Sequence, residues 1–318
     1  MPNRTTPLTP ARPSDAGPRS SRTALLGGPA PILLAAVLWG TTGTAGSLAP
    51  AGAPAAAIGS AGLALGGTLL LLSSRGARSL PAACTGRERW LLVLGALAVA
   101  GYPVTFYPAV ARTGVAVATV IALGSAPVFA GLLTWLTGRS RPTARWTAAT
   151  AAAVLGCALL VLGPELTGAT TPMDLTGVAL AACGGLSYAV YSLIGGTLIT
   201  RGHSSDAVMG VLFGAAGLLV LPLLASVDMR WITTTRGAAV AGHLALFTVC
   251  LAYRLFGHGL RRTSASAATS LTLAEPAVAA VLSVTVLDER LPAVSWTGLT
   301  VLVLSLALLA FPTGRHTP

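Results

Sequence analysis

Long apolar runs alternate with short polar connections along almost the whole chain. Each run holds about 20 residues with at most one charged side chain, which is enough to cross about 30 Å of hydrocarbon as a helix. The pattern therefore predicts an all-α integral membrane protein with ten transmembrane helices. We expect them over residues 31–49, 54–73, 90–110, 114–137, 145–163, 176–199, 207–226, 238–259, 264–287 and 292–311.

The two ends of the chain lack such runs. Residues 1–30 are rich in Pro, Ser, Thr and Arg, which predicts a disordered cytoplasmic tail, and residues 312–318 form a short C-terminal tail. A cleaved signal peptide is the alternative for the first run. The long segment before it and the nine runs after it argue against that alternative.

Composition and charge agree with a lipid environment. The chain is 53% hydrophobic and 9% charged, whereas soluble domains carry about 25% charged residues. The net charge of +11 raises the question of nucleic acid, but the basic residues lie between the apolar runs and form no continuous face. We therefore expect a lipid bilayer as the surroundings and no nucleic-acid partner.

The arginines predict the orientation in the membrane. All 20 basic residues are arginine, and 15 of them fall on the side of the two termini. Four lie on the opposite side: Arg112, Arg230, Arg236 and Arg290. Because positive residues accumulate in cytoplasmic connections, both termini are expected to be cytoplasmic in a multi-pass protein of the cell membrane.

An internal repeat divides the chain into two halves, residues 31–163 and 164–311. The segments 112–133 and 261–282 resemble each other and align Pro127 with Pro276 at an offset of 149. The same offset aligns Trp39 with Tyr188 and Arg87 with Arg236. Each half holds five predicted helices, an odd number, so the second half would enter the membrane inverted. Inverted repeats of this kind are typical of transporters.

Several motifs carry a resemblance to a known family. The strongest is LAEPAVAAVLSVTVLDERL from Leu273 to Leu291, supported by Trp39-Gly40, by LSYAVYSLIGG in the sixth run and by SAPVFAGLL in the fourth. Over residues 31–311 the chain resembles the EamA-type branch of the drug/metabolite transporter superfamily. The resemblance implies two inverted five-helix repeats whose helices 1, 3, 4, 6, 8 and 9 line a cavity. It also implies export or exchange of amino acids, other metabolites or drugs.

One departure from the family pattern follows the fourth run. Many relatives carry an acid there, whereas this chain has Gly138-Arg139-Ser140-Arg141. A role for that acid is therefore not carried over to the first half.

Glu275 is the only acid inside any predicted span. It lies about 16 Å into the ninth span at 1.5 Å per residue, close to the midplane. An ionised carboxylate there costs about 3 kcal/mol or more, so the side chain should face the bundle interior. This profile fits a group that couples to protons or binds a substrate amine. The alternative is a structural carboxyl near the Pro276 kink.

Two prolines predict breaks at equivalent positions. Pro276 removes a donor and should leave a carbonyl near Thr272 without its helical partner, and Pro127 should do the same in the fourth helix. Such breaks suit hinges or carbonyls that face a ligand. Ordinary kinks remain the alternative, because proline is common in membrane helices.

The eighth run predicts a polar stripe on one face. Helical spacing places five side chains within about 80° of each other: His243, Phe247, Cys250, Arg254 and His258. Arg254 could reach inward to pair with Glu275, or it could extend to the membrane interface as arginines near helix ends do. A pair with Glu275 would favour a zwitterionic substrate and argue against proton coupling.

Aromatic side chains form the remaining predicted cavity wall. We expect Trp39, Tyr102, Tyr188 and Tyr191 to reach the cavity, where aromatic faces can hold apolar or cationic ligands. Anchoring at the membrane interface is the alternative, and it is favoured for Tyr107.

The sequence therefore favours a secondary transporter of small molecules that works by alternating access. A membrane-embedded enzyme acting on lipid-type substrates is the second hypothesis, and a sensor or scaffold is the third. No cofactor motif is found. The four cysteines contain no CxxC pair, and the four histidines show no ligand spacing to acids, so no metal site is expected. Assembly into a homo-oligomer is left open.

Overall fold

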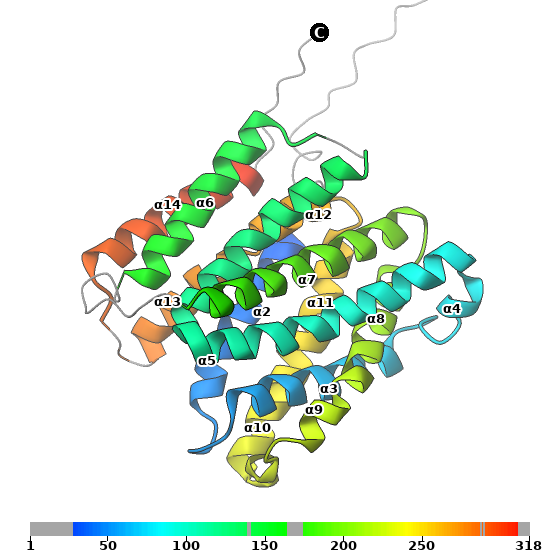
Figure 1. The fold of residues 1–318 in the computed structure, drawn as a ribbon, viewed down its shortest axis with the longest axis horizontal. Helices are drawn as coiled ribbons and strands as arrows, with labels where there is room; N and C mark the ends of the chain where they lie inside the picture. Colours follow the sequence, from blue (N-terminus) through cyan, green and yellow to red (C-terminus); the bar gives the residue numbers. More distant parts are fainter. Residues whose placement is uncertain (1–27, 139–140, 164–173, 287, 289, 311–318) are drawn as a thin grey trace, which may run out of the picture.

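The computed structural model describes residues 28–138, 141–163, 174–286, 288 and 290–310 (Figure 1). Every regular element within these residues is a helix. The predicted tails, apart from residues 28–30, and the connection 164–173 lie outside the described residues.

Seven helices are regular over most of a membrane span: α2 (Pro29–Ser47), α3 (Ala55–Ser73), α5 (Gly86–Leu136), α6 (Ala144–Leu162), α7 (Leu175–Thr200), α8 (Ser205–Leu219) and α14 (Ala293–Ala310). Two more spans are composite. One joins α10 (Thr235–His243), the π-helical η3 (Leu244–Leu251) and α11 (Ala252–Gly259), and the other joins α12 (Ala265–Leu271) to α13 (Ala274–Val286). Short helices complete the described fold: α4 (Leu80–Ala83), α9 (Leu221–Ala225) and η2 (Arg230–Thr233).

Within the described residues, eight helices are long and apolar enough to cross a membrane. The first helix, α2, matches the first predicted run in position but is not among the eight. Its second half, residues 40–47, reads GTTGTAGS and so combines small and hydroxyl residues instead of large apolar ones.

The helix α5 is one of these eight, but its two ends run in different directions. At 51 residues it would be about 77 Å long if straight, more than twice the thickness of the hydrocarbon. Gly114 interrupts it with φ 82° and ψ 161°, a backbone conformation that suits glycine. The two arms on either side of Gly114 correspond to the predicted spans 90–110 and 114–137.

Contacts with α7 show that the two arms run in opposite directions. Along α7, Gly177 lies against Thr113, Gly184 against both Thr105 and Ala122, and Ile194 against Gly95. Further along α7, Thr197 and Thr200 share a pocket with Thr134 of the second arm. The first arm is therefore antiparallel to α7 and the second arm is parallel to it, so α5 is a hairpin (Figure 1).

Side-chain caps explain where several helices begin. Thr85, Thr143, Thr234 and Ser264 each accept a hydrogen bond from the backbone N–H three residues later. Asp174 caps α7 and also pairs with Arg112 at 3.2 Å. The Gly177 N–H, with help from Arg112, lowers the pKa of the Asp174 carboxyl, so the cap stays ionised at neutral pH.

Small residues allow the helices to approach closely. A Cβ added to Gly156 of α6 would lie 2.6 Å from the Leu302 backbone nitrogen of α14. A Cβ on Gly298 of α14 would in turn lie 2.7 Å from the Gly156 carbonyl oxygen. The two glycines thus form a reciprocal contact that holds α6 and α14 side by side along one edge of the bundle (Figure 1).

We predict that Gly156→Ala destabilises the protein by about 1–3 kcal/mol, because the new methyl group would meet backbone that has no rotamer to change. Thermal unfolding of the purified protein in detergent measures the effect. Gly43→Ala is the matched control, since no atom lies within 4 Å of its added Cβ. A melting temperature unchanged in Gly156→Ala would contradict the close contact.

Candidate functional site

The ninth predicted helix is broken at the point where its acid and proline lie. The helix α12 ends at Leu271 and α13 begins at Ala274, with Glu275 and Pro276 in its first turn. Pro276 needs no N–H partner there, because the first residues of a helix have none. The Thr272 carbonyl accepts a hydrogen bond from the Glu275 N–H at 2.9 Å, so it gains a partner in place of the one that Pro276 cannot supply.

The equivalent proline in the first half behaves differently. Pro127 lies inside the second arm of α5, where the backbone stays helical, and Gly114 is the residue of α5 with non-helical angles. An interior proline removes one hydrogen bond but need not end a helix that neighbouring helices hold in place. A hinge role for Pro127 stays a prediction, and the break in the described α5 lies 13 residues earlier.

Glu275 lies beside a group of polar aromatic side chains. It is partly buried, and its N–H bonds the carbonyl of Thr272, whose hydroxyl in turn accepts from the Tyr188 hydroxyl. Its backbone lies against α2, since a Cβ added to Gly40 would be 3.0 Å from the Glu275 carbonyl oxygen. Within the described part of the chain, its carboxylate makes no hydrogen bond or ion pair with another side chain.

Arg254 does not neutralise this carboxylate. Its Nη2 donates a hydrogen bond at 2.9 Å to the Ser73 hydroxyl, at the end of α3. Of the two alternatives for Arg254, the geometry agrees with the one in which the guanidinium extends to a helix end. The acid at the break is therefore left without a basic partner among the described residues.

Tyr188 and Thr272 connect α7 to the break. The Tyr188 hydroxyl donates to the Thr272 Oγ1 at 2.8 Å, and Thr272 Oγ1 donates in turn to the Thr269 carbonyl at 2.9 Å. Both side chains are buried. The sequence named both residues for other reasons, and the structure joins them in one hydrogen-bonded chain that fixes the tyrosine beside Glu275.

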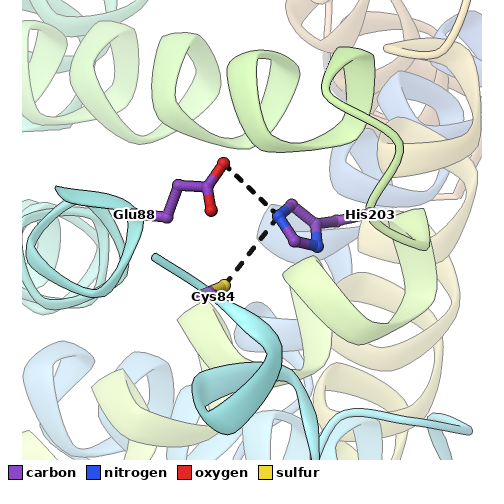
Figure 2. Close-up of side chains that lie close together, drawn as sticks. All are labelled: Cys84, Glu88 and His203. Carbon is purple, nitrogen blue, oxygen red and sulfur yellow. Dashed lines mark hydrogen bonds and ion pairs between the residues drawn. The ribbon is translucent and has the colours of Figure 1, made fainter. Parts of the chain in front are cut away.

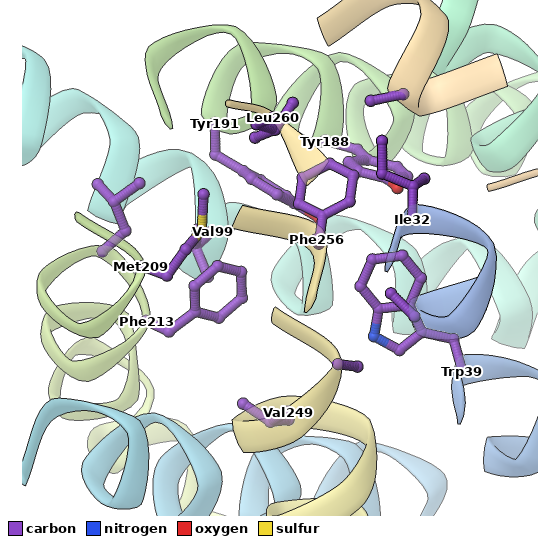
Figure 3. Close-up of a cluster of buried hydrophobic side chains, with 14 of the residues drawn as sticks. Ile32, Trp39, Val99, Tyr188, Tyr191, Met209, Phe213, Val249, Phe256 and Leu260 are labelled. Carbon is purple, nitrogen blue, oxygen red and sulfur yellow. The ribbon is translucent and has the colours of Figure 1, made fainter. Parts of the chain in front are cut away.

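Trp39 meets Tyr188 across the centre of the bundle. Their rings are 6.4 Å apart and nearly perpendicular, at 87°. The Trp39 indole donates a hydrogen bond at 2.8 Å to the Thr248 carbonyl in η3. Figure 3 shows the indole beside Phe256, and the Phe256 ring in turn lies 6.2 Å from Tyr188, so the three rings contact one another. The two positions related by the offset of 149 residues are therefore neighbours.

The two other tyrosines predicted to reach the cavity, Tyr191 and Tyr102, differ in burial. Tyr191 is buried, and its ring stacks on Tyr188 at 5.1 Å. The hydroxyl oxygens of Tyr191 and Tyr253 are 3.3 Å apart. Tyr102 stacks on Phe106 at 5.3 Å and is only partly buried. Sequence reasoning missed Tyr253, which contacts Trp39 at 4.9 Å.

The π-helix explains why the predicted stripe on the eighth span is wrong as a single face. A π-helix closes hydrogen bonds from i to i+5, so each residue turns the chain by less than it does in an α-helix. Cys250 is consequently buried, whereas Phe247 is 39% exposed and His258 is exposed. Tyr253, and not Arg254, is directed toward Trp39 and Tyr191.

His243 lies at the start of this π-helix and connects it to α2. Its Nε2 is 2.9 Å from the Thr41 Oγ1, and its ring lies 5.1 Å from Phe247. Together with the Trp39–Thr248 bond, this contact joins α2 to the start and to the middle of the irregular segment. Irregular backbone in a membrane protein needs such partners because lipid offers none.

These features define a multi-pass membrane protein with a polar, aromatic centre at a broken helix. The sequence profile of the EamA-like transporter family matches residues 27–162 and again residues 175–311. The chain therefore belongs to the EamA-like transporter family.

Two further comparisons agree with this assignment. A Bacillus subtilis (strain 168) protein described as "Uncharacterized transporter YwfM" is 38% identical over 282 residues, which is 88% of this chain and 92% of that protein. A solved structure described only as "Crystal structure of protein" has a TM-score of 0.72 at 20% identity, covering 90% of this chain and 96% of that one. The second likeness supports the fold alone.

We predict that Trp39→Phe lowers the free energy of unfolding by about 1–3 kcal/mol, because the buried Thr248 carbonyl loses its indole donor. Thermal unfolding in detergent measures the change. Trp90→Phe is the matched control, since Trp90 is 75% exposed. Equal melting temperatures for the two variants would show that the hydrogen bond does not stabilise the bundle.

Proposed function

We propose that this protein is a secondary transporter that exports or exchanges small metabolites, amino acids or drugs across the cytoplasmic membrane. Transport would proceed by alternating access around Glu275. The observation that carries the proposal is an acid at a helix break, partly exposed, next to the Tyr188–Thr272 bond and with no basic partner in the described structure. An acid without a partner inside a membrane helix is costly, and such acids usually mark a substrate or ion pathway.

Ten crossings in two inverted halves are part of the proposal. The ten would be α2, α3, the two arms of α5 and α6 in the first half, then α7, α8 with α9, the π-containing helix, α12 with α13, and α14. Positions that lie near a two-fold axis meet their symmetry mates. The contact between Trp39 and Tyr188 supports such an axis in the membrane plane.

Helix pairs further from the centre support the same symmetry. The fifth helix of one half, α6, packs on its counterpart α14 through Gly156 and Gly298. The second helix, α3, packs on its counterpart α8, where a Cβ on Gly67 would lie 2.2 Å from the Phe213 carbonyl oxygen. Close pairing of equivalent helices is expected when two halves are related by a two-fold axis.

The chemistry around Glu275 favours substrates that carry a protonated amine or another organic cation. A carboxylate provides the opposite charge, and the faces of Tyr102, Tyr188 and Trp39 can hold a cation or an apolar group. The same carboxyl could exchange its proton for the substrate, which would couple transport to a proton gradient. No nucleotide-binding motif occurs in the sequence, so a gradient or an exchanged solute would supply the energy.

The arginine distribution supports an orientation with both termini in the cytoplasm. The ends of α3 and α7 next to Arg75 and Arg201 would then lie on the cytoplasmic side of the membrane. The Arg112–Asp174 pair would lie on the opposite side.

We expect Glu275→Gln to abolish transport driven by a proton gradient while the protein still inserts and folds. Metabolites released by cells that express the wild type are compared by mass spectrometry with those released by cells that express an equal amount of the variant. Asp228→Asn, an acid-to-amide change at an exposed position, is the control and should behave as the wild type. Release that is unchanged in Glu275→Gln and follows an imposed pH gradient would contradict the role of Glu275.

We further expect Arg254→Ala to leave the release of amine-bearing metabolites unchanged, because its guanidinium bonds Ser73 and not Glu275. The same comparison by mass spectrometry tests this. A selective loss of carboxylated metabolites would show that Arg254 turns inward during transport and would favour zwitterionic substrates.

A further inference from the structure

Three side chains with metal-binding atoms meet at one end of the bundle. Cys84 follows α4, Glu88 lies in the first turn of α5, and His203 follows the end of α7. The His203 Nε2 is 3.9 Å from the Cys84 Sγ and 3.5 Å from the Glu88 Oε1 (Figure 2). We call these residues the Cys84–Glu88–His203 cluster.

The distances in the cluster suit a tetrahedral ion. Its three ligand atoms all lie within 4.8 Å of one another. Zinc bonds of about 2.3 Å to sulfur and about 2.0–2.1 Å to nitrogen and oxygen place tetrahedral S and N ligands about 3.6 Å apart, and N and O ligands about 3.4 Å apart. The observed separations of 3.9 and 3.5 Å exceed these by a few tenths of an ångström, so side-chain rotation alone could close them.

The surroundings hold the ligand atoms in place. One carboxylate oxygen of Glu88, Oε2, accepts hydrogen bonds at 3.0 Å from both the Thr85 N–H and the Thr85 hydroxyl. The other oxygen, Oε1, is thereby directed toward His203. The turn that carries His203 is fixed by its N–H bond to the Leu198 carbonyl and by Gly202 at φ 101°. Oriented ligands of this kind are usual around bound metals.

Burial also favours a built site. Cys84 and Glu88 are both buried, and the His203 side chain is 18% exposed. The three ligand side chains are therefore mostly covered by protein, and His203 reaches the surface in part. A buried thiol, a carboxylate and an imidazole form a mixed donor set that zinc accepts, with water as the fourth ligand.

Arg201 is the competing cation. Its Nη1 lies 3.4 Å from the same Glu88 Oε1 that faces His203. The Arg201 side chain is 40% exposed, so it can turn into solvent when a divalent ion takes its place. The arrangement therefore predicts that Arg201 weakens metal binding.

We propose that Cys84, Glu88 and His203 bind a Zn²⁺ ion that joins the connection before α5 to the connection after α7. Nothing in the proposed transport cycle requires this ion, because the cluster lies at the helix ends and Glu275 at the central break. A bound ion would link the first arm of α5 to the turn between α7 and α8, and would stabilise the arrangement of helices seen here.

The test uses the full-length protein, purified in detergent with a tag that contains no histidine and stripped of metal by a chelator. Zinc is titrated by calorimetry, and Co²⁺ is then added in its place, because a thiolate ligand gives cobalt a charge-transfer absorption band. We expect one Zn²⁺ per chain and a sulfur-to-cobalt band. In Cys84→Ser and in His203→Gln the affinity should fall at least about tenfold.

Matched variants separate this site from adventitious binding. Cys183→Ser and His258→Gln change an exposed cysteine and an exposed histidine, and both should bind zinc as the wild type does. Arg201→Gln should bind zinc more tightly, since it removes the competing cation. Gel filtration in the absence of metal checks that each variant is folded.

The proposal is overturned if the wild type binds no stoichiometric zinc, or if folded Cys84→Ser and His203→Gln both retain wild-type affinity. Weaker binding in Arg201→Gln would also contradict it, because Arg201 would then support the site instead of competing for Glu88.

Discussion

Hydrocarbon provides no hydrogen-bond partner for a peptide group, and this constraint shapes the whole chain. Regular helices meet it without help, since all of their interior N–H and C=O groups pair within the segment. Each departure from regular helix must be compensated by the protein itself. In the break between α12 and α13, the Glu275 N–H binds the Thr272 carbonyl, and in η3 the Trp39 indole binds the Thr248 carbonyl.

The irregular segments and the polar side chains consequently lie together. The break contains Thr272 and Glu275, and the π-helix brings Tyr253 toward Trp39 and Tyr191. The hydroxyl and indole groups that satisfy the backbone also line the only part of the described interior where an acid lies beside several aromatic rings. The irregular helix segments thus bring together the polar and aromatic side chains that a binding site in the bundle centre would use.

Apolar length made most of the span positions predictable. The predicted span 54–73 and α3 (Ala55–Ser73) differ by one residue at the start, and 145–163 and α6 (Ala144–Leu162) by one at each end. Local geometry inside a span was harder, because hydropathy does not distinguish an α-helical turn from a π-helical one. The stripe on the eighth span failed for this reason, whereas the turn of α5 at Gly114 falls where the predicted spans 90–110 and 114–137 adjoin. Side chains that meet across 119 residues, such as Cys84 and His203, leave no spacing signal at all.

The Trp39–Tyr188 contact has an energetic consequence for a chain built from two halves. In the proposed alternating-access cycle, identical halves would give inward-facing and outward-facing states that are related by the two-fold axis and equal in free energy. Here one position carries an indole that donates to a backbone carbonyl, and its counterpart carries a phenol that donates to a threonine hydroxyl. These bonds differ in donor and acceptor, so the two states of the proposed cycle would differ in free energy. In such a cycle, divergence between the two halves would let side-chain chemistry set a resting orientation, which an assembly of two identical chains could not do.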